Sequence, residues 1–375
     1  MRILVSAGEA SGDRYAAGLV KALAARLPRA RFFGCAGPQM RIHGVDAIVR
    51  TEDLAVVGLF EVTRHIPRIY GLFRRLERAA AESPPDLAIL TDSPDFNLRL
   101  ATRLRRAGIP VVYYVAPQVW AWRKGRIRQI RRLVDLLLVI FPFEEGFFRE
   151  RGVSAHFVGH PLCDLAKVSS NRADFLSEHS FIPGEPLVAL LPGSRKGESL
   201  RHLPALEDAA HRLAASGVRQ FVLPAAATTG ERFFAERWKG PQTRIVEDQT
   251  QDCIGHADVA LVASGSATVE TALLGTPMVS FYKLSWSSYY LARLLVDVRY
   301  YTMVNLLAGR QLITECIQHE CTGTKLASEA IRLLQQDAER CRMISEFSNL
   351  RSTLQGEAPA AERAAAAICE RFSIG

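Results

Sequence analysis

The sequence predicts an α/β protein with two open, mostly parallel sheets. Short continuous apolar runs recur along the 375-residue chain and alternate with segments of helical periodicity. Such runs are typical of parallel strands, because helices cover both faces of the sheet and bury both sides of each strand. The chain is also too long for a typical single domain, so two domains are expected.

The apolar runs place the expected strands in order. They lie at residues 2–6, 31–35, 86–91, 110–115, 135–140 and 156–158, and then at 187–191, 219–223, 243–246, 258–262 and 277–281. The segment 162–186 lacks a clear strand and ends in Pro183-Gly184-Glu185-Pro186, which is typical of a boundary. We therefore expect domains at residues 1–165 and 166–345. A helical tail at 346–375 should pack back on the first domain.

The charge balance favours an anionic partner. Lys and Arg number 47 against 39 Asp and Glu, which gives a net charge of +8. Nucleic acid, acidic lipid and a phosphorylated substrate all fit such an excess.

The seven cysteines and the start of the chain indicate the compartment. The cysteines form no Cys-x-x-Cys pair, which argues against a disulfide framework and a structural zinc site. The N-terminus enters a strand at once, without the apolar segment and cleavage site of a signal peptide. No apolar run approaches the length of a membrane-spanning helix. A reduced, cytoplasmic protein is expected.

Two glycine-containing turns in the second half predict a phosphate site, since each follows a buried strand and opens a helix. A helix N-terminus presents N–H groups and a partial positive charge to anions. Each turn alone is also an ordinary helix cap, but the pair indicates a nucleotide-diphosphate-sugar ligand. Glu270, one turn into the second helix, is expected to hold ribose hydroxyls. The expected phosphate contacts are Gly193, Ser194 and Arg195 in the first turn, and Ser264, Gly265, Ser266 and Ala267 in the second.

Two acidic residues follow strands of the first half. Asp92 ends a buried strand, where a carboxylate is costly unless it faces a cleft or is paired, so we assign it as a general base. Glu9, in the glycine-containing loop after the first strand, is the alternative base. Asp95 is expected to cap the helix that follows Asp92.

Two segments suggest contacts with an amphiphilic anion. Trp120 and Trp122 precede Arg123 and a run of further basic residues. In the segment 54–76, apolar residues recur at helical spacing beside five arginines, which predicts a membrane dock. The alternative is that this apolar face packs on the domain core. The apolar positions of the dock are Ile66, Ile69, Tyr70, Leu72, Phe73 and Leu76.

Taken in order, these motifs resemble the lipid-A-disaccharide synthase family over nearly the whole chain. The matching segments are residues 6–13, 36–40, 92–97, 113–122, 141–144, 157–160, 190–195, 263–270 and 305–310. The resemblance implies the GT-B architecture, with two Rossmann-like domains and the active site in the cleft between them.

The resemblance also implies an activity. The family joins UDP-2,3-diacylglucosamine to 2,3-diacylglucosamine 1-phosphate with inversion, forming a β-1,6-linked lipid A disaccharide 1-phosphate and UDP. Asp92 and Glu9 match its catalytic positions, and Arg195, Glu270 and Asn305 match positions tied to donor binding. No metal, cofactor or nucleic-acid partner is expected. Peripheral association with the cytoplasmic leaflet of the inner membrane is expected, and a homodimer is left open.

Two other functions compete with this one. A UDP-sugar epimerase shares the two-domain fold and the diphosphate site. A non-catalytic binder of RNA or acidic membrane fits the basic charge but leaves Asp92 and the two phosphate turns unexplained. The chain contains no Asp-x-Asp and no P-loop motif, which argues against the usual metal–diphosphate site of the other glycosyltransferase architecture and against a P-loop NTPase.

Overall fold

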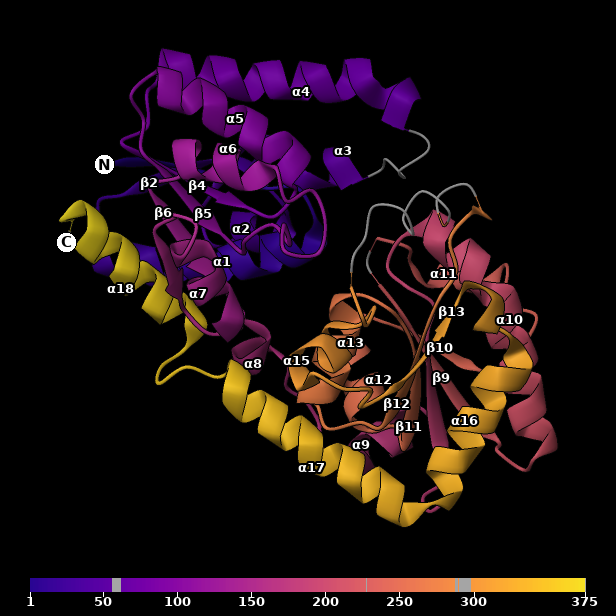
Figure 1. The fold of residues 1–375 in the computed structure, drawn as a ribbon. Helices are drawn as coiled ribbons and strands as arrows, with labels where there is room; N and C mark the ends of the chain where they lie inside the picture. Colours follow the sequence, from indigo (N-terminus) through magenta and orange to yellow (C-terminus); the bar gives the residue numbers. More distant parts are fainter. Residues whose placement is uncertain (56–61, 227, 287–288, 290–297, 375) are drawn as a thin grey trace. The chain divides into compact units, whose positions relative to one another are not determined.

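The structure is a computed structural model that describes residues 1–55, 62–226, 228–286, 289 and 298–374 (Figure 1). It contains two compact units. Unit 1 is formed by Met1–Cys163 together with Leu354–Gly375, and unit 2 by Asp164–Thr353. The chain therefore leaves unit 1, builds unit 2 and returns to unit 1 at its C-terminal end.

The described part of unit 1 contains a seven-stranded parallel sheet with the order β3-β2-β1-β4-β5-β6-β7. The order reverses next to β1, so β1 and β4 form the topological switch point of the unit. The strands are β1 (Arg2–Ala7), β2 (Arg31–Ala36), β3 (Asp46–Arg50), β4 (Leu87–Thr91), β5 (Val111–Tyr114), β6 (Leu136–Val139) and β7 (Ala155–Phe157).

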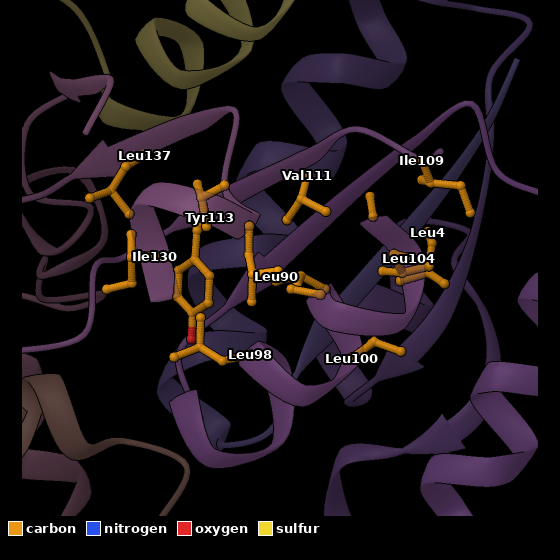
Figure 2. Packing of buried hydrophobic residues seen from close by; sticks show 14 of the residues in the cluster. Leu4, Leu90, Leu98, Leu100, Leu104, Ile109, Val111, Tyr113, Ile130 and Leu137 are labelled. Atoms are coloured by element: carbon orange, nitrogen blue, oxygen red, sulfur yellow. The ribbon is translucent and has the colours of Figure 1, made fainter. Parts of the chain in front are cut away.

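Three helices of unit 1 cover one face of this sheet: α4 (Val62–Glu82), α5 (Pro94–Arg106) and α6 (Arg126–Leu133). Their inner residues interlock with alternate strand residues in one core, of which Figure 2 shows Leu98, Ile130 and Tyr113. The remaining helices are α1 (Ala10–Arg26), α2 (Pro38–Ile42), α3 (Thr51–Ala55), α7 (Pro142–Arg149), α8 (Leu162–Leu165) and α18 (Ala360–Phe372).

The last helix, α18, packs on α1. Ile368 is fully buried there. The Arg26 guanidinium lies 3.2 Å from the Glu362 carboxylate, and Arg363 donates a 2.9 Å hydrogen bond to the Phe157 carbonyl. The C-terminal segment thus completes the core of unit 1.

The sheet described in unit 2 has six parallel strands in the order β10-β9-β8-β11-β12-β13, which is the Rossmann order with β8 and β11 at its switch point. The strands are β8 (Leu187–Leu191), β9 (Gln220–Ala225), β10 (Arg244–Glu247), β11 (Val259–Ala263), β12 (Met278–Tyr282) and β13 (Thr314–Ile317). The helices within the described residues are α9 (Arg172–Glu178), α10 (Lys196–Ala215), α11 (Glu231–Ala235), α12 (Thr250–Gly255), α13 (Ser266–Leu273), α15 (Met303–Ala308), α16 (Gly323–Gln335) and α17 (Asp337–Leu354).

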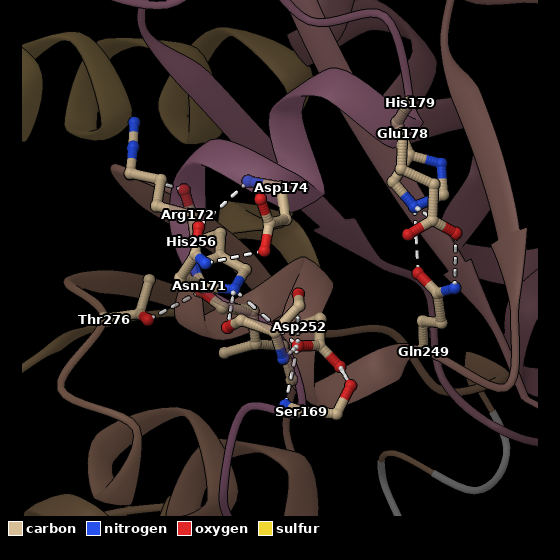
Figure 3. Close-up of polar contacts among 12 residues, drawn as sticks. Ser169, Asn171, Arg172, Asp174, Glu178, His179, Gln249, Asp252, His256 and Thr276 are labelled. Carbon is tan, nitrogen blue, oxygen red and sulfur yellow. Dashed lines mark hydrogen bonds and ion pairs between the residues drawn. The ribbon is translucent and has the colours of Figure 1, made fainter.

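The segment that enters unit 2 is tied to it by polar contacts with Asp252 and Asp258 (Figure 3). The Asp252 carboxylate accepts hydrogen bonds from the Ser169 amide (2.8 Å), the Ser169 hydroxyl (2.7 Å) and the Ser170 amide (3.0 Å). Burial raises the pKa of Asp252, but these hydrogen bonds outweigh it and hold the pKa below its ordinary value. Arg172 pairs with Asp258 at 2.9 Å.

The two-sheet α/β fold predicted from the sequence is confirmed, and each expected strand is present. Two strands were missed: β3 and β13, each at one edge of its sheet. Among the helices that the described ranges contain, none is both long enough and apolar enough to cross a membrane.

Candidate functional site

Asp92 directly follows β4, at the switch point of unit 1, and has an unusual backbone. Its φ is 51° and that of Ser93 is 40°, so both non-glycine residues occupy the left-handed region. Such a conformation costs of order 1–3 kcal/mol and persists only where the surroundings enforce it. Strained residues of this kind cluster at functional sites.

A buried asparagine holds this turn. The Asn97 amide nitrogen donates to the Thr91 carbonyl at 2.8 Å and to the Asp92 carbonyl at 2.9 Å. Its oxygen accepts from the Ser6 hydroxyl at 2.7 Å, and the Tyr113 hydroxyl also donates to the Asp92 carbonyl. The backbone of Asp92 is therefore fixed from β1, β5 and α5 together. Our sequence reasoning did not assign a role to Asn97.

The loop after β1 fixes the Asp92 carboxylate. The Gly8 amide donates to Asp92 Oδ1 at 3.0 Å. A Cβ on Gly12 would lie 1.8 Å from Asp92 Oδ2, so the close approach requires glycine there. Glu9, next to Gly8, is half-buried at the N-terminus of α1. The structure thus brings the two predicted carboxylate positions to the same end of adjacent strands.

A third loop joins this end of the sheet through Asp13. Its buried carboxylate accepts from the amides of Gly37 (2.8 Å), Gln39 (2.9 Å) and Met40 (3.2 Å), at the start of α2. Burial raises the pKa of Asp13, although these hydrogen bonds act in the opposite direction. Asp13 therefore orders the loop after β2.

The first phosphate turn follows β8. Gly193 has a φ of 109°, and Arg195 stands at the N-terminus of α10 with an exposed side chain. The buried His202 ring holds the turn, since Nδ1 lies 2.7 Å from the Pro192 carbonyl and Nε2 accepts from the Lys283 amide at 3.0 Å. Burial lowers the pKa of His202 to about 4.

The second phosphate turn follows β11, the strand beside β8, so both turns lie at the switch point of unit 2. Gly265 precedes α13, and the first N–H groups of such a helix have no partner within it. One expected donor is corrected: the Ser264 amide donates to the Phe281 carbonyl at 2.8 Å. The phosphate donors expected in this turn are therefore Gly265, Ser266 and Ala267. Glu270 is half-buried, and its carboxylate accepts from Gln251 at 2.8 Å.

Comparisons with known proteins identify the family of the chain. The family model for lipid-A-disaccharide synthetase matches residues 3–369. The lipid-A-disaccharide synthase of Solibacter usitatus is 53% identical over 98% of this chain and 97% of its own length. That of Myxococcus xanthus is 43% identical over 100% of this chain and 98% of its own length.

The chain belongs to the lipid-A-disaccharide synthase family.

Solved structures show the same fold at low sequence identity. A UDP complex of S. aureus MnaA aligns with a TM-score of 0.67 and 14% identity over 100% of this chain and 97% of its own. The glycosyltransferase of kitacinnamycin aligns with a TM-score of 0.64 and 16% identity over 99% and 98%. Membership of the lipid-A-disaccharide synthase family supports a role in lipid A disaccharide synthesis and favours neither the epimerase nor the RNA-binding alternative.

In this family member Asn305 does not present its side chain to a ligand, which corrects our expectation. It is fully buried. Its nitrogen donates to the Ile313 carbonyl (2.9 Å) and the Glu315 carboxylate (2.8 Å), and its oxygen accepts from the amides of Leu312 (2.7 Å) and Ile313 (2.9 Å). These bonds use every hydrogen-bonding position of the amide. Asn305 therefore orders the chain between α15 and β13.

The expected dock on α4 is corrected in part. Leu72, Phe73 and Leu76 are buried in the core of unit 1, because they interlock with β-sheet residues as most amphipathic helices do. Ile69 is half-buried and Tyr70 exposed. Residues 56–61 and the side chain of Ile66 lie outside the described part of the chain. Leu72 and Phe73 are thus unavailable to a membrane.

The predicted Trp-x-Trp segment lies between an acidic and a basic partner. The Trp120 indole donates to the buried Glu144 carboxylate at 3.0 Å. The Arg123 guanidinium covers the Trp122 ring at 4.3 Å and pairs with Asp95 at 2.9 Å. Asp95 therefore does not cap α5, whose N-cap residue is Ser93. It neutralises the start of the basic run instead.

Proposed function

We propose that this chain transfers 2,3-diacylglucosamine from UDP-2,3-diacylglucosamine to 2,3-diacylglucosamine 1-phosphate, forming the β-1,6-linked disaccharide 1-phosphate and UDP. The observation that carries the proposal is the fixed carboxylate of Asp92 at the switch point of unit 1. A general base needs a defined position, and Asn97 and Gly8 supply it.

In the proposed step the acceptor 6-oxygen forms a bond to the anomeric carbon of the donor. The bond from that carbon to the phosphate oxygen of UDP breaks on the opposite face, so the configuration inverts. The hydroxyl proton passes to the Asp92 carboxylate. Proton transfer of this kind contributes typically about 10²–10⁴-fold to a rate. Glu9, beside Gly8, is the alternative base.

Unit 2 is proposed to bind the donor. Arg195 and the amides of Gly265, Ser266 and Ala267 would neutralise the leaving diphosphate, with Gly193 and Ser194 shaping the first turn. Both turns lie at the carboxyl ends of the switch-point strands, where open α/β sheets bind ligands. Glu270 would accept hydrogen bonds from the ribose. Asn305 acts on this site through the backbone that it orders.

Both proposed substrates carry acyl chains, so we also propose peripheral association with the cytoplasmic leaflet of the inner membrane. On the acceptor side we propose three residues: Trp120, Trp122 and Arg123. They follow β5, which is the neighbour of β4 in the sheet of unit 1.

The test is the Asp92→Asn variant, assayed by mass spectrometry of the disaccharide product. UDP binding should be retained, while turnover falls by about 10²-fold or more. Glu82→Gln is the control, since Glu82 is an exposed carboxylate of the same unit at the end of α4. Turnover of Asp92→Asn near that of the control would remove Asp92 as the base.

A further inference from the structure

The exposed side of α6 carries a concentrated positive charge. Arg128, Arg131 and Arg132 are all exposed, and their spacing of three and four residues places them on one side of the helix. Two surface hollows of about 660 and 580 Å³ open among them. We call this region the α6 basic surface; its charged residues are Lys124, Arg128, Arg131, Arg132 and Arg151.

Arg128, Arg131 and Arg132 have no acidic partner among the described residues. By contrast, Arg105 pairs with Asp135 at 2.8 Å, and Arg123 and Arg126 share Asp95. Like charges three and four residues apart repel each other along a helix. The fold therefore gains nothing from the uncompensated cluster, and an external anion would relieve the repulsion.

Positive charge continues onto the helices beside α6. Arg99 and Arg106 of α5 and Arg78 of α4 are exposed, and no described carboxylate pairs with them. α5 packs against both α4 and α6 in the layer that covers one face of the sheet (Figure 1). The cation-rich area thus extends over a helix layer rather than a single binding pocket.

We propose that the α6 basic surface binds the anionic headgroups of a lipid bilayer. The proposal rests on the proposed function in one respect, because lipid-linked substrates bring the enzyme to a membrane. The attraction is electrostatic: Leu72 and Phe73, the apolar residues expected to insert, lie in the core instead. Each basic residue near an anionic membrane contributes about fivefold to binding, that is, about 1 kcal/mol.

The same surface lacks what single-stranded nucleic acid requires. Base stacking needs accessible aromatic faces within the basic groove. Among the described residues, no aromatic side chain lines either hollow. Arginines lie over two rings of the flanking segments, Arg123 over Trp122 at 4.3 Å and Arg151 over Phe147 at 4.0 Å. A charged lipid surface needs no stacking and is favoured.

The experiment measures sedimentation of the full chain with vesicles. Wild-type protein should bind vesicles that contain phosphatidylglycerol, fail to bind pure phosphatidylcholine, and dissociate in about 0.5 M NaCl, where charges are screened within a few ångströms. The variant Arg128→Gln/Arg131→Gln/Arg132→Gln should bind about 100-fold more weakly, since three contributions are lost. Glutamine keeps helix propensity, and an unchanged melting temperature confirms folding.

The matched control removes the same charge from unit 2 by Arg219→Gln, Arg232→Gln and Arg342→Gln, all of them exposed. It should bind vesicles as wild type does. An equal loss in the control, full vesicle binding by the α6 variant, or binding that survives the salt would each overturn the proposal. The proposal would also be overturned if the α6 variant kept vesicle binding but lost binding to single-stranded RNA.

Turnover separates this surface from the proposed function. With detergent-dispersed substrates the α6 variant should retain wild-type turnover, because no bilayer is present. Loss of turnover in detergent would place the arginines in the catalytic machinery and overturn the proposal. If the wild-type chain formed no disaccharide yet bound vesicles through α6, the proposed function would fail and the surface would stand.

Discussion

At the residue scale, the site depends on a side chain that never touches substrate in the proposed step. Asn97 donates both of its amide hydrogens to the carbonyls of Thr91 and Asp92. These bonds hold the left-handed backbone of Asp92. A small displacement of a catalytic group is enough to slow a reaction by about 10²-fold. Asn97 is therefore a positioning residue for Asp92.

We expect Asn97→Ala to lower kcat by about 10²-fold with little change in KM or in UDP affinity. Losing these buried hydrogen bonds should also cost about 1–3 kcal/mol of unfolding free energy. Steady-state kinetics and calorimetry check both. Thr102→Ala is the control, since Thr102 bonds within the same helix at 2.9 Å. Equal losses of kcat in the two variants would mean that Asn97 serves only the stability of α5.

A second residue-scale prediction concerns the donor. Arg195→Ala should weaken UDP binding by about 1.5–3 kcal/mol, because a hydrogen bond to a charged group is lost. Isothermal calorimetry measures it, and Arg201→Ala on the exposed side of the same helix is the control. UDP affinity that is unchanged by Arg195→Ala would remove this residue from the site.

At the element scale, the sequence predicted the strands that are buried on both sides and missed those at the edges. β3 and β13 carry Asp46, Arg50 and Glu315 within or at their ends, so neither is a continuous apolar run. The turns after β8 and β11 were predictable because glycine and hydroxyl residues follow an apolar run directly. Whether the apolar face of α4 packs on the core or faces a membrane was not predictable, because both require apolar residues at the same helical spacing.

Contacts between distant segments also escaped prediction. Asn97 bonds to residues of β1 and β4, and Asn305 to residues around β13, and nothing in the local sequence distinguishes these amides from ligand-binding ones. The resemblance to a family ties Asn305 to donor binding, whereas the observed side chain is fully used in hydrogen bonds to the surrounding chain. Only the observed hydrogen bonds distinguish an amide that orders the chain from one that binds a ligand.

The last helix, α18, should contribute to the stability of unit 1. Ile368 is fully buried where α18 packs on unit 1. Ile368→Ala should lower the unfolding free energy by about 2–5 kcal/mol through lost burial and a cavity. Ile344→Ala is the control, because Ile344 is 40% exposed on α17. Urea unfolding followed by circular dichroism compares them; equal effects would show that α18 adds little to unit 1.

At the scale of the whole molecule, buried titratable groups give the stability a pH dependence of mixed sign. Burial raises the pKa of Glu144 from 4.5 to about 7. Between these values the folded state binds more protons than the unfolded one, so the unfolding free energy falls as pH rises. Burial lowers the pKa of His160 to about 3 and of His202 to about 4 from 6.5. Their contribution has the opposite sign and is lost as pH falls below about 6.5.

The Glu144→Gln variant isolates the contribution of Glu144, which lies in unit 1, to this pH dependence. The uncharged side chain cannot ionise, so the change in unfolding free energy from pH 4.5 to 7 should be more positive in the variant than in the wild type by roughly 3 kcal/mol. Replacing Trp238 and Trp286 by Phe leaves Trp120 and Trp122 as fluorescent reporters of unit 1. Glu150→Gln, which removes an exposed carboxyl, should show the same change as the wild type. An equal change in Glu144→Gln and in the wild type would assign the pH dependence to other groups, such as Asp13, whose pKa burial also raises.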